Sequence, residues 1–215
     1  MDVIKNKVSS VFFQYSIPSV LGMLAISSAS IVDGYFIGNY VGDLGLAAIN
    51  ISLPIFSLLF GLSLMLAIGG SVTSGKLIGE KDIKNASLIF TKTVICIIGF
   101  SFIICFLLFI NIETILYLLG SNDDLIKISM EYMSILLIFL PFLMIGVVLD
   151  YFVRVDNRPN LAFIALLSSA VVHVLLDWIL IVHLEKGIFD AALATGISEL
   201  VLIIILLPHF FSEKG

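Results

Sequence analysis

Charged residues are scarce in this sequence. Asp, Glu, Lys and Arg together make up 13% of the 215 residues, whereas hydrophobic residues make up 60% and the mean hydropathy is +1.18. A soluble domain of this length could not cover so much apolar surface, so the composition indicates an all-α polytopic membrane protein. The chain also lacks a basic tract with interleaved aromatic residues, so we expect no nucleic-acid partner.

Cysteine is nearly absent, which leaves little scope for disulfides. Cys96 and Cys105 are the only two, and both lie in one apolar run. Nine positions at about 100° per residue place them on opposite faces of a helix, so they cannot bridge to each other. We expect both to be small, buried hydrophobic side chains.

Long apolar runs fill most of the chain, and each exceeds or approaches the length of about 20 residues that a transmembrane helix needs. They predict a single six-helix transmembrane lobe over residues 1–215. The first run is too long for a signal peptide, so we expect it to be retained as a membrane span. The six predicted helices are about 11–39, 46–72, 87–110, 130–153, 160–183 and 188–208.

The segment between the third and fourth runs is amphipathic rather than uniformly apolar. Residues 111–119 predict a short helix at the membrane interface. Gly120 and Asn122 follow it, and this pair is typical of a helix stop followed by a cap.

Basic residues are distributed unevenly between the two ends of the predicted bundle. If the N-terminus is cytoplasmic, nine of them fall inside and two outside, as the positive-inside rule requires. We therefore expect a multi-pass protein of a prokaryotic plasma (inner) membrane, with both termini cytoplasmic. The inner residues are Lys5, Lys7, Lys76, Lys81, Lys84, Lys92, Arg154, Arg158 and Lys214, and the outer residues are Lys127 and Lys186.

One acid, Asp33, lies inside the first apolar run. An ionisable side chain within a membrane span is costly and usually faces a functional cavity. Asp33 lies about 10 Å from the outer end of its predicted helix, and Asp177 and Thr195 lie at a similar depth in the fifth and sixth helices. Pro18 lies in the same run as Asp33 and predicts a kink, because its ring removes a backbone donor.

Further polar residues lie one helical turn deeper on the same faces. His173 precedes Asp177 by four residues, and Glu199 follows Thr195 by four. We expect one cavity lined by Asp33, His173, Asp177, Thr195 and Glu199, with Asn50 as a further candidate. Purely structural interpretations stay open for three of these: an interhelical hydrogen bond for His173, a bond to its own helix for Thr195, and pairing with another helix for Glu199.

Taken together, these segments resemble the N-terminal half of the multidrug and toxic compound extrusion (MATE) family, in the branch usually called DinF-like. The resemblance covers essentially the whole chain and rests on the order and spacing of its motifs. These are Pro18 with IVDGYFIG, then GGSVTSGKLIGEKDIKNAS, LLGSNDDLIKISMEYM, FVRVDNRPNLAF, VLLDWILI and FDAALATGIS.

The resemblance implies a secondary antiporter rather than an enzyme. Such a protein exports cationic, amphipathic compounds in exchange for protons or sodium ions and needs no other cofactor. By motif, the coupling-ion positions are Asp33, Asp177 and Thr195, which are the candidate sodium ligands, and His173 stands where the family commonly has asparagine. An imidazole nitrogen is softer than a carbonyl oxygen and repels cations when protonated, so this departure favours protons over sodium.

The resemblance also implies a second six-helix lobe, because the family is built from two parallel repeats. Two interpretations stay open: the chain is a truncated or split half, or two copies pair as a homodimer. The main alternative function is a lipid or lipid-linked oligosaccharide flippase of the same superfamily, which would favour basic residues in its cavity. An intramembrane metal enzyme would need about three or four close ligands, of which His173 and Asp177 are two. An inactive half that requires another lobe is the third alternative.

Overall fold

The computed structural model describes residues 7–184 and 187–211, so Lys5, Lys186 and Lys214, used above to assign orientation, lie outside it. Within these ranges the chain is helical, and six helices are long and apolar enough to cross a membrane. The all-α, six-helix prediction is therefore confirmed. The elements are α1 (Val8–Phe36), η1 (Ile37–Val41, a π-helical turn), α2 (Asp43–Gly79), α3 (Ile83–Ile110), α4 (Ile112–Leu118), α5 (Ile126–Val155), α6 (Pro159–Asp177), η2 (Trp178–His183, a second π-helical turn) and α7 (Ile188–Phe210).

When the π-helical turns are counted with the helices that they follow, each span is longer than its apolar run, most clearly in α2, where polar residues at the ends continue the helical hydrogen bonding. The short helix predicted after the third span is present as α4. Gly120 ends it with a φ of 104°, in the left-handed region that favours glycine. The side chain of Asn122 then accepts the amide hydrogens of Asp124 and Leu125, at 3.1 and 3.0 Å, ahead of α5.

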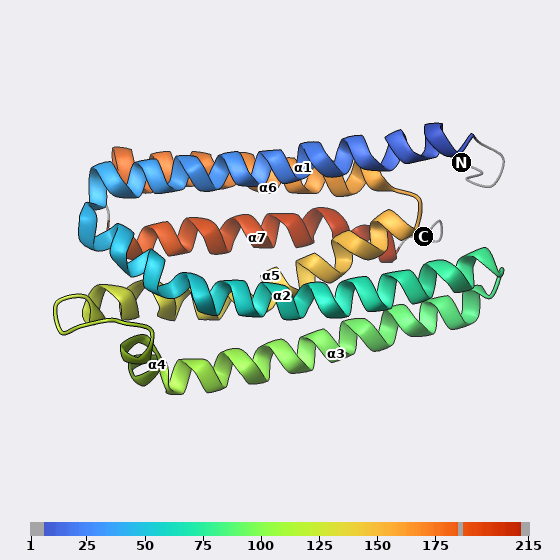
Figure 1. The fold of residues 1–215 in the computed structure, drawn as a ribbon. Helices are drawn as coiled ribbons and strands as arrows, with labels where there is room; N and C mark the ends of the chain where they lie inside the picture. The colour runs from blue at the N-terminus through green and yellow to red at the C-terminus, as the bar shows by residue number, and fades with distance from the viewer. Residues whose placement is uncertain (1–6, 185–186, 212–215) are drawn as a thin grey trace.

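The helices lie roughly parallel or antiparallel in one bundle (Figure 1). Helices α1 and α6 pack side by side along one edge, and the α2–α3 hairpin forms the other edge. Helix α5 contacts α2 and α3 of one edge and also α7, which packs against α6 of the other edge. Helix α1 begins and α7 ends at the same end of the bundle, here called the inner end; α4 lies at the opposite, outer end.

Close packing in the centre depends on small residues. A Cβ atom on Gly196 of α7 would lie 2.8 Å from Cβ of Phe139 in α5 and would overlap its ring, so only glycine fits there. The outward surfaces are apolar, as a lipid environment requires; Phe102 and Phe106 of α3 are examples. Both cysteines are free: Cys105 is buried, whereas Cys96 is exposed, which corrects the expected burial, because α3 is an edge helix.

The described basic residues follow the predicted asymmetry, since all except Lys127 lie in the inner half of the bundle. Arg154 also has a specific partner there. Its Nε and Nη2 atoms donate to the two carboxylate oxygens of Asp150 at 2.9 and 3.0 Å. Its Nη1 atom donates to Ser19 of α1, and Tyr15 of α1 donates to Asn157 at 2.8 Å. The inner segment of α1 is thereby fastened to the α5–α6 turn on both sides of Pro18.

Replacing Arg154 with alanine should destabilise the bundle, because Asp150 is only 7% exposed and would lose its counter-charge. Breaking a buried pair from one side typically costs about 3 kcal/mol. Arg158→Ala is the matched control, since Arg158 is exposed in the same turn. Thermal unfolding of the detergent-purified chain should give a clearly lower midpoint for Arg154→Ala than for Arg158→Ala. Equal midpoints would contradict the assigned role of the pair.

Candidate functional site

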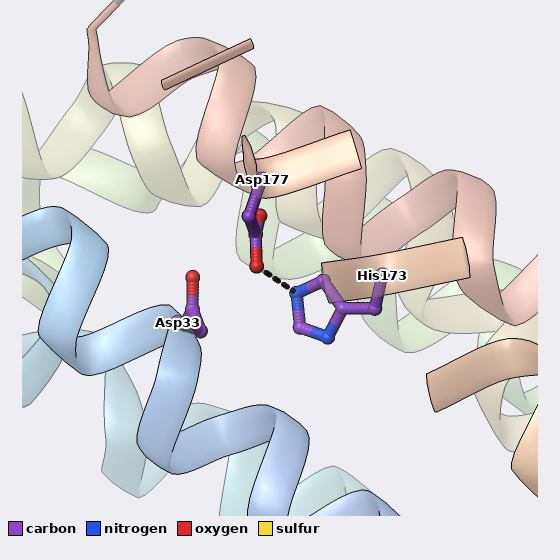
Figure 2. Close-up of side chains that lie close together, drawn as sticks. All are labelled: Asp33, His173 and Asp177. Carbon is purple, nitrogen blue, oxygen red and sulfur yellow. Dashed lines mark ion pairs between the residues drawn. The ribbon is translucent and has the colours of Figure 1, made fainter. Parts of the chain in front are cut away.

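Three ionisable side chains meet at the outer half of the α1–α6 pair. Asp33, His173 and Asp177 each place one ligand atom within 4.8 Å of the others. His173 Nε2 lies 3.4 Å from Asp177 Oδ2, and the Asp33 carboxylate faces both across the gap between α1 and α6 (Figure 2). We call these three residues the acid–imidazole cluster.

The local backbone explains why the acids meet. Asp177 is the last residue of α6 before the η2 turn, and Asp33 lies in the last turn of α1 before η1. The two helices pack along their length, so their outer ends stay adjacent. His173 lies one turn before Asp177 and therefore projects from the same face, as the spacing predicted.

Thr195 of α7 joins the cluster from a third helix. Its hydroxyl oxygen lies 3.2 Å from His173 Nε2 and also donates to the Ala191 carbonyl at 3.2 Å. Both structural interpretations left open by the sequence, an interhelical bond for His173 and a bond to its own helix for Thr195, are thus geometrically present. They do not preclude a role in ion binding, because the hydroxyl keeps oxygen lone pairs available.

The carboxylates lack the hydrogen bonds that normally compensate burial. The Asp177 side chain is completely buried, and neither of its oxygens has a hydrogen-bond donor among the described residues; the same holds for Asp33 Oδ1. Two acids held close together in an apolar medium repel each other strongly when both are ionised. The arrangement therefore favours uptake of a positive charge, whether a proton or a metal cation.

A cavity of about 320 Å³ opens beside the cluster; we call it the outer cavity. Its lining combines apolar side chains, most of them from α2, with polar groups from α1, α2, α5, α6 and α7. The lining residues are Ser30, Asp33, Gly34, Leu46, Ile49, Asn50, Ser52, Leu53, Phe56, Tyr132, Leu136, His173 and Thr195.

The predicted cavity residues divide into three groups. Asp33, His173, Thr195 and Asn50 line the outer cavity, as expected. Asp177 lies behind its wall and contacts it through His173. Glu199 is not among the residues that line this cavity, because it lies one turn further along α7 than Thr195 and deeper in the bundle.

Tyr132 was not among the residues predicted to line the cavity. It is 7% exposed and lines the outer cavity from α5. The signal was available, because Tyr132 is a polar residue about two turns inside a helix that starts at the outer end, which is the depth of the cluster.

A second cavity, of about 510 Å³, lies at the inner end between α2, α3, α5 and α7. In its aromatic lining, the ring of Phe90 stacks on that of Phe210 and meets that of Phe152 edge to face. Its one acid, Asp156, is already paired with His209 at 2.6 Å. The outer cavity is therefore the better candidate for ion chemistry.

Comparison with known proteins agrees with this geometry. The family model described as MatE matches residues 18–179. The chain belongs to the MatE family.

Individual relatives of this MatE chain are longer than it is. It is 28% identical over 211 residues to the multidrug export protein MepA of Staphylococcus saprophyticus, and 25% identical over 210 residues to that of Staphylococcus aureus. Each match covers 98% of this chain and 47% of the relative, so the chain spans about half the length of these curated relatives. A crystal structure of MATE in complex with MaD3S superposes with a TM-score of 0.88 over 94% of this chain and 45% of that one, at 23% identity, which supports the fold.

The orientation expected for this MatE chain can be tested with single cysteines. In a background carrying Cys96→Ser and Cys105→Ala, we expect Asn50→Cys, in the outer cavity, to react with a membrane-impermeant thiol reagent added to intact cells. Ser87→Cys is the matched control, because it is an exposed position lining the inner cavity. It should react only after the membrane is permeabilised. The opposite pattern would contradict cytoplasmic termini.

Proposed function

We propose that this chain is one lobe of a secondary antiporter that exports cationic, amphipathic compounds in exchange for protons or sodium ions. The observation that carries the proposal is the acid–imidazole cluster beside the outer cavity, where the half-buried Asp33 lies close to the buried Asp177 and three of their four carboxylate oxygens have no hydrogen-bond donor among the described residues. Membership of the MatE family, and relatives that are multidrug export proteins, support the same function.

The coupling step follows from electrostatics. When the outer cavity is open to the outside, ionised Asp33 and Asp177 attract a proton or a monovalent cation, because their mutual repulsion is not relieved by hydrogen bonds. Uptake cancels part of that charge. The outer part of α1 can then move against α6, while the contacts of Arg154 with Ser19 and of Tyr15 with Asn157 hold the segment around Pro18 in place.

The substrate class follows from the cavity walls. Leu46, Leu53 and Phe56 provide an apolar surface for the body of an amphipathic compound, and Asp33 provides the opposite charge for a cationic group. A bound ion and a cationic compound compete for the same negative charge, so binding of one promotes release of the other.

The imidazole favours protons as the coupling ion. A sodium ion prefers a shell made only of oxygen ligands, whereas His173 places a nitrogen between Asp177 and Thr195. Asp33, Asp177 and Thr195 still offer oxygens to sodium, so ion preference is set by whether His173 can turn away.

Transport by the complete protein requires, in this proposal, a second six-helix lobe. The relatives are about twice as long as this chain. The second lobe is either a C-terminal half or another copy of the same chain, and in both cases the lobes share the plasma membrane of a bacterium with their termini inside.

Flippase activity is the weaker alternative, because phosphate groups would need basic residues. The described lining of the outer cavity contains Asp33 and His173 but no lysine or arginine. A lipid pyrophosphate would therefore meet negative charge rather than a binding partner.

The function can be tested by ethidium efflux from cells that produce this chain, alone and together with a candidate second lobe. Asp33→Asn should reduce efflux to the level of cells without the chain, because the amide cannot take up a proton or balance a cation. Asp43→Asn is the matched control, since Asp43 is exposed at the start of α2 outside the cavity, and it should retain efflux. Retained efflux in Asp33→Asn, at equal membrane abundance, would remove Asp33 from the coupling site.

A further inference from the structure

The acid–imidazole cluster has the donor set and spacing of a transition-metal site. Bonds of about 2.0–2.1 Å to a tetrahedral zinc ion place neighbouring donors about 3.3 Å apart. His173 Nε2 lies 3.4 Å from Asp177 Oδ2 and 3.2 Å from the Thr195 hydroxyl oxygen. Asp33 lies within 4.8 Å of the other two ligand atoms and needs to approach by about 1.5 Å to complete the set.

We propose that the acid–imidazole cluster, completed by Thr195, binds a divalent transition-metal ion of the zinc type. Asp33 comes from α1, His173 and Asp177 from α6, and Thr195 from α7, so one ion would join three helices. Within residues 7–184 and 187–211, no other group of three metal-ligating side chains lies this close.

The chemistry of the donors selects the metal. Imidazole is a preferred ligand of zinc, copper, iron and nickel, whereas sodium, magnesium and calcium prefer oxygen ligands alone. Two carboxylates match the two positive charges of the ion. A histidine at position 173 therefore changes which cations the site accepts, since a residue with a neutral carbonyl oxygen there would leave only hard donors.

The burial of Asp177 and the access to the cluster through the outer cavity also support a metal site. Asp177 is completely buried, and both of its oxygens lack a hydrogen-bond donor among the described residues, so a ligand would satisfy them. Asp33 and His173 line the outer cavity, which gives an ion an aqueous route to the cluster. The side chains point towards a common centre between α1 and α6 (Figure 2).

Metal binding would arrest movement of α1 relative to α6, because the same ion would hold Asp33 to His173 and Asp177. Binding itself is independent of drug export, but this consequence rests on the function proposed above. Zinc should therefore inhibit export by the assembled transporter.

The test is titration of the detergent-purified 215-residue chain with zinc chloride by calorimetry, together with cobalt(II) absorption spectroscopy. We expect saturable binding of zinc and the intense visible bands of tetrahedral cobalt. His173→Asn should weaken zinc binding by at least about tenfold, since even loss of a residue that only orients a ligand costs 10- to 100-fold. His209→Asn is the matched control, because His209 pairs with Asp156 at the inner end, and it should bind zinc like the unmodified chain.

Three results would overturn the proposal: no saturable binding, equal affinity in His173→Asn, or an equal loss in His209→Asn. Displacement of zinc by magnesium or calcium at similar concentrations would also overturn it, because it would indicate a site of hard oxygen donors. The cobalt spectrum of the unmodified chain gives a result even where a variant does not fold. If the chain binds zinc but does not support export, only the proposed export function is contradicted. If it supports export but does not bind zinc, only the proposed zinc site is contradicted.

Discussion

Two carboxylates lie close together where the outer ends of α1 and α6 meet, and the buried one, Asp177, has no hydrogen-bond donor for either oxygen among the described residues. Leaving charge uncompensated inside an apolar bundle is unfavourable, so the surrounding structure must hold it in place. The long contact between α1 and α6 does this on one side, and α5 supports the bundle from behind. His173 and Thr195 supply the polar contacts nearest to the acids.

The two ends of α1 differ in how firmly they are held. The inner segment is tied to the α5–α6 turn by Arg154 with Ser19 and by Tyr15 with Asn157. The outer segment carries Asp33 and ends in a π-helical turn, a geometry that often occurs at functional positions. Asp177 also immediately precedes a π-helical turn, and the two turns contact each other. Pro18 lies within the tied inner segment, between Tyr15 and Ser19.

Much of this arrangement could be predicted from the sequence, because membrane spans and helical spacing are strong signals. The lengths of the apolar runs predicted six helices, and counting residues from the expected helix ends placed Asp33, Asp177 and Thr195 in one layer. Depth, however, does not determine rotation about the helix axis. Glu199 was expected to line the outer cavity and does not, whereas Tyr132, which does line it, was not among the predicted residues. Detailed packing contacts, such as Gly196 against Phe139, also could not be predicted from the sequence.

Carboxylates from the first and fifth spans, Asp33 and Asp177, lie together in this bundle. The most direct measurement is cysteine cross-linking of Asp33→Cys with Asp177→Cys, in a chain without native cysteines and with a protease site in the turn between α2 and α3. A short bifunctional thiol reagent should keep the two fragments together after cleavage, and reduction should separate them. Pairing Asp33→Cys with Ile97→Cys of α3 supplies the control that should not cross-link. If the fragments of the Asp33→Cys, Asp177→Cys variant separate without reduction, the two carboxylates do not lie together.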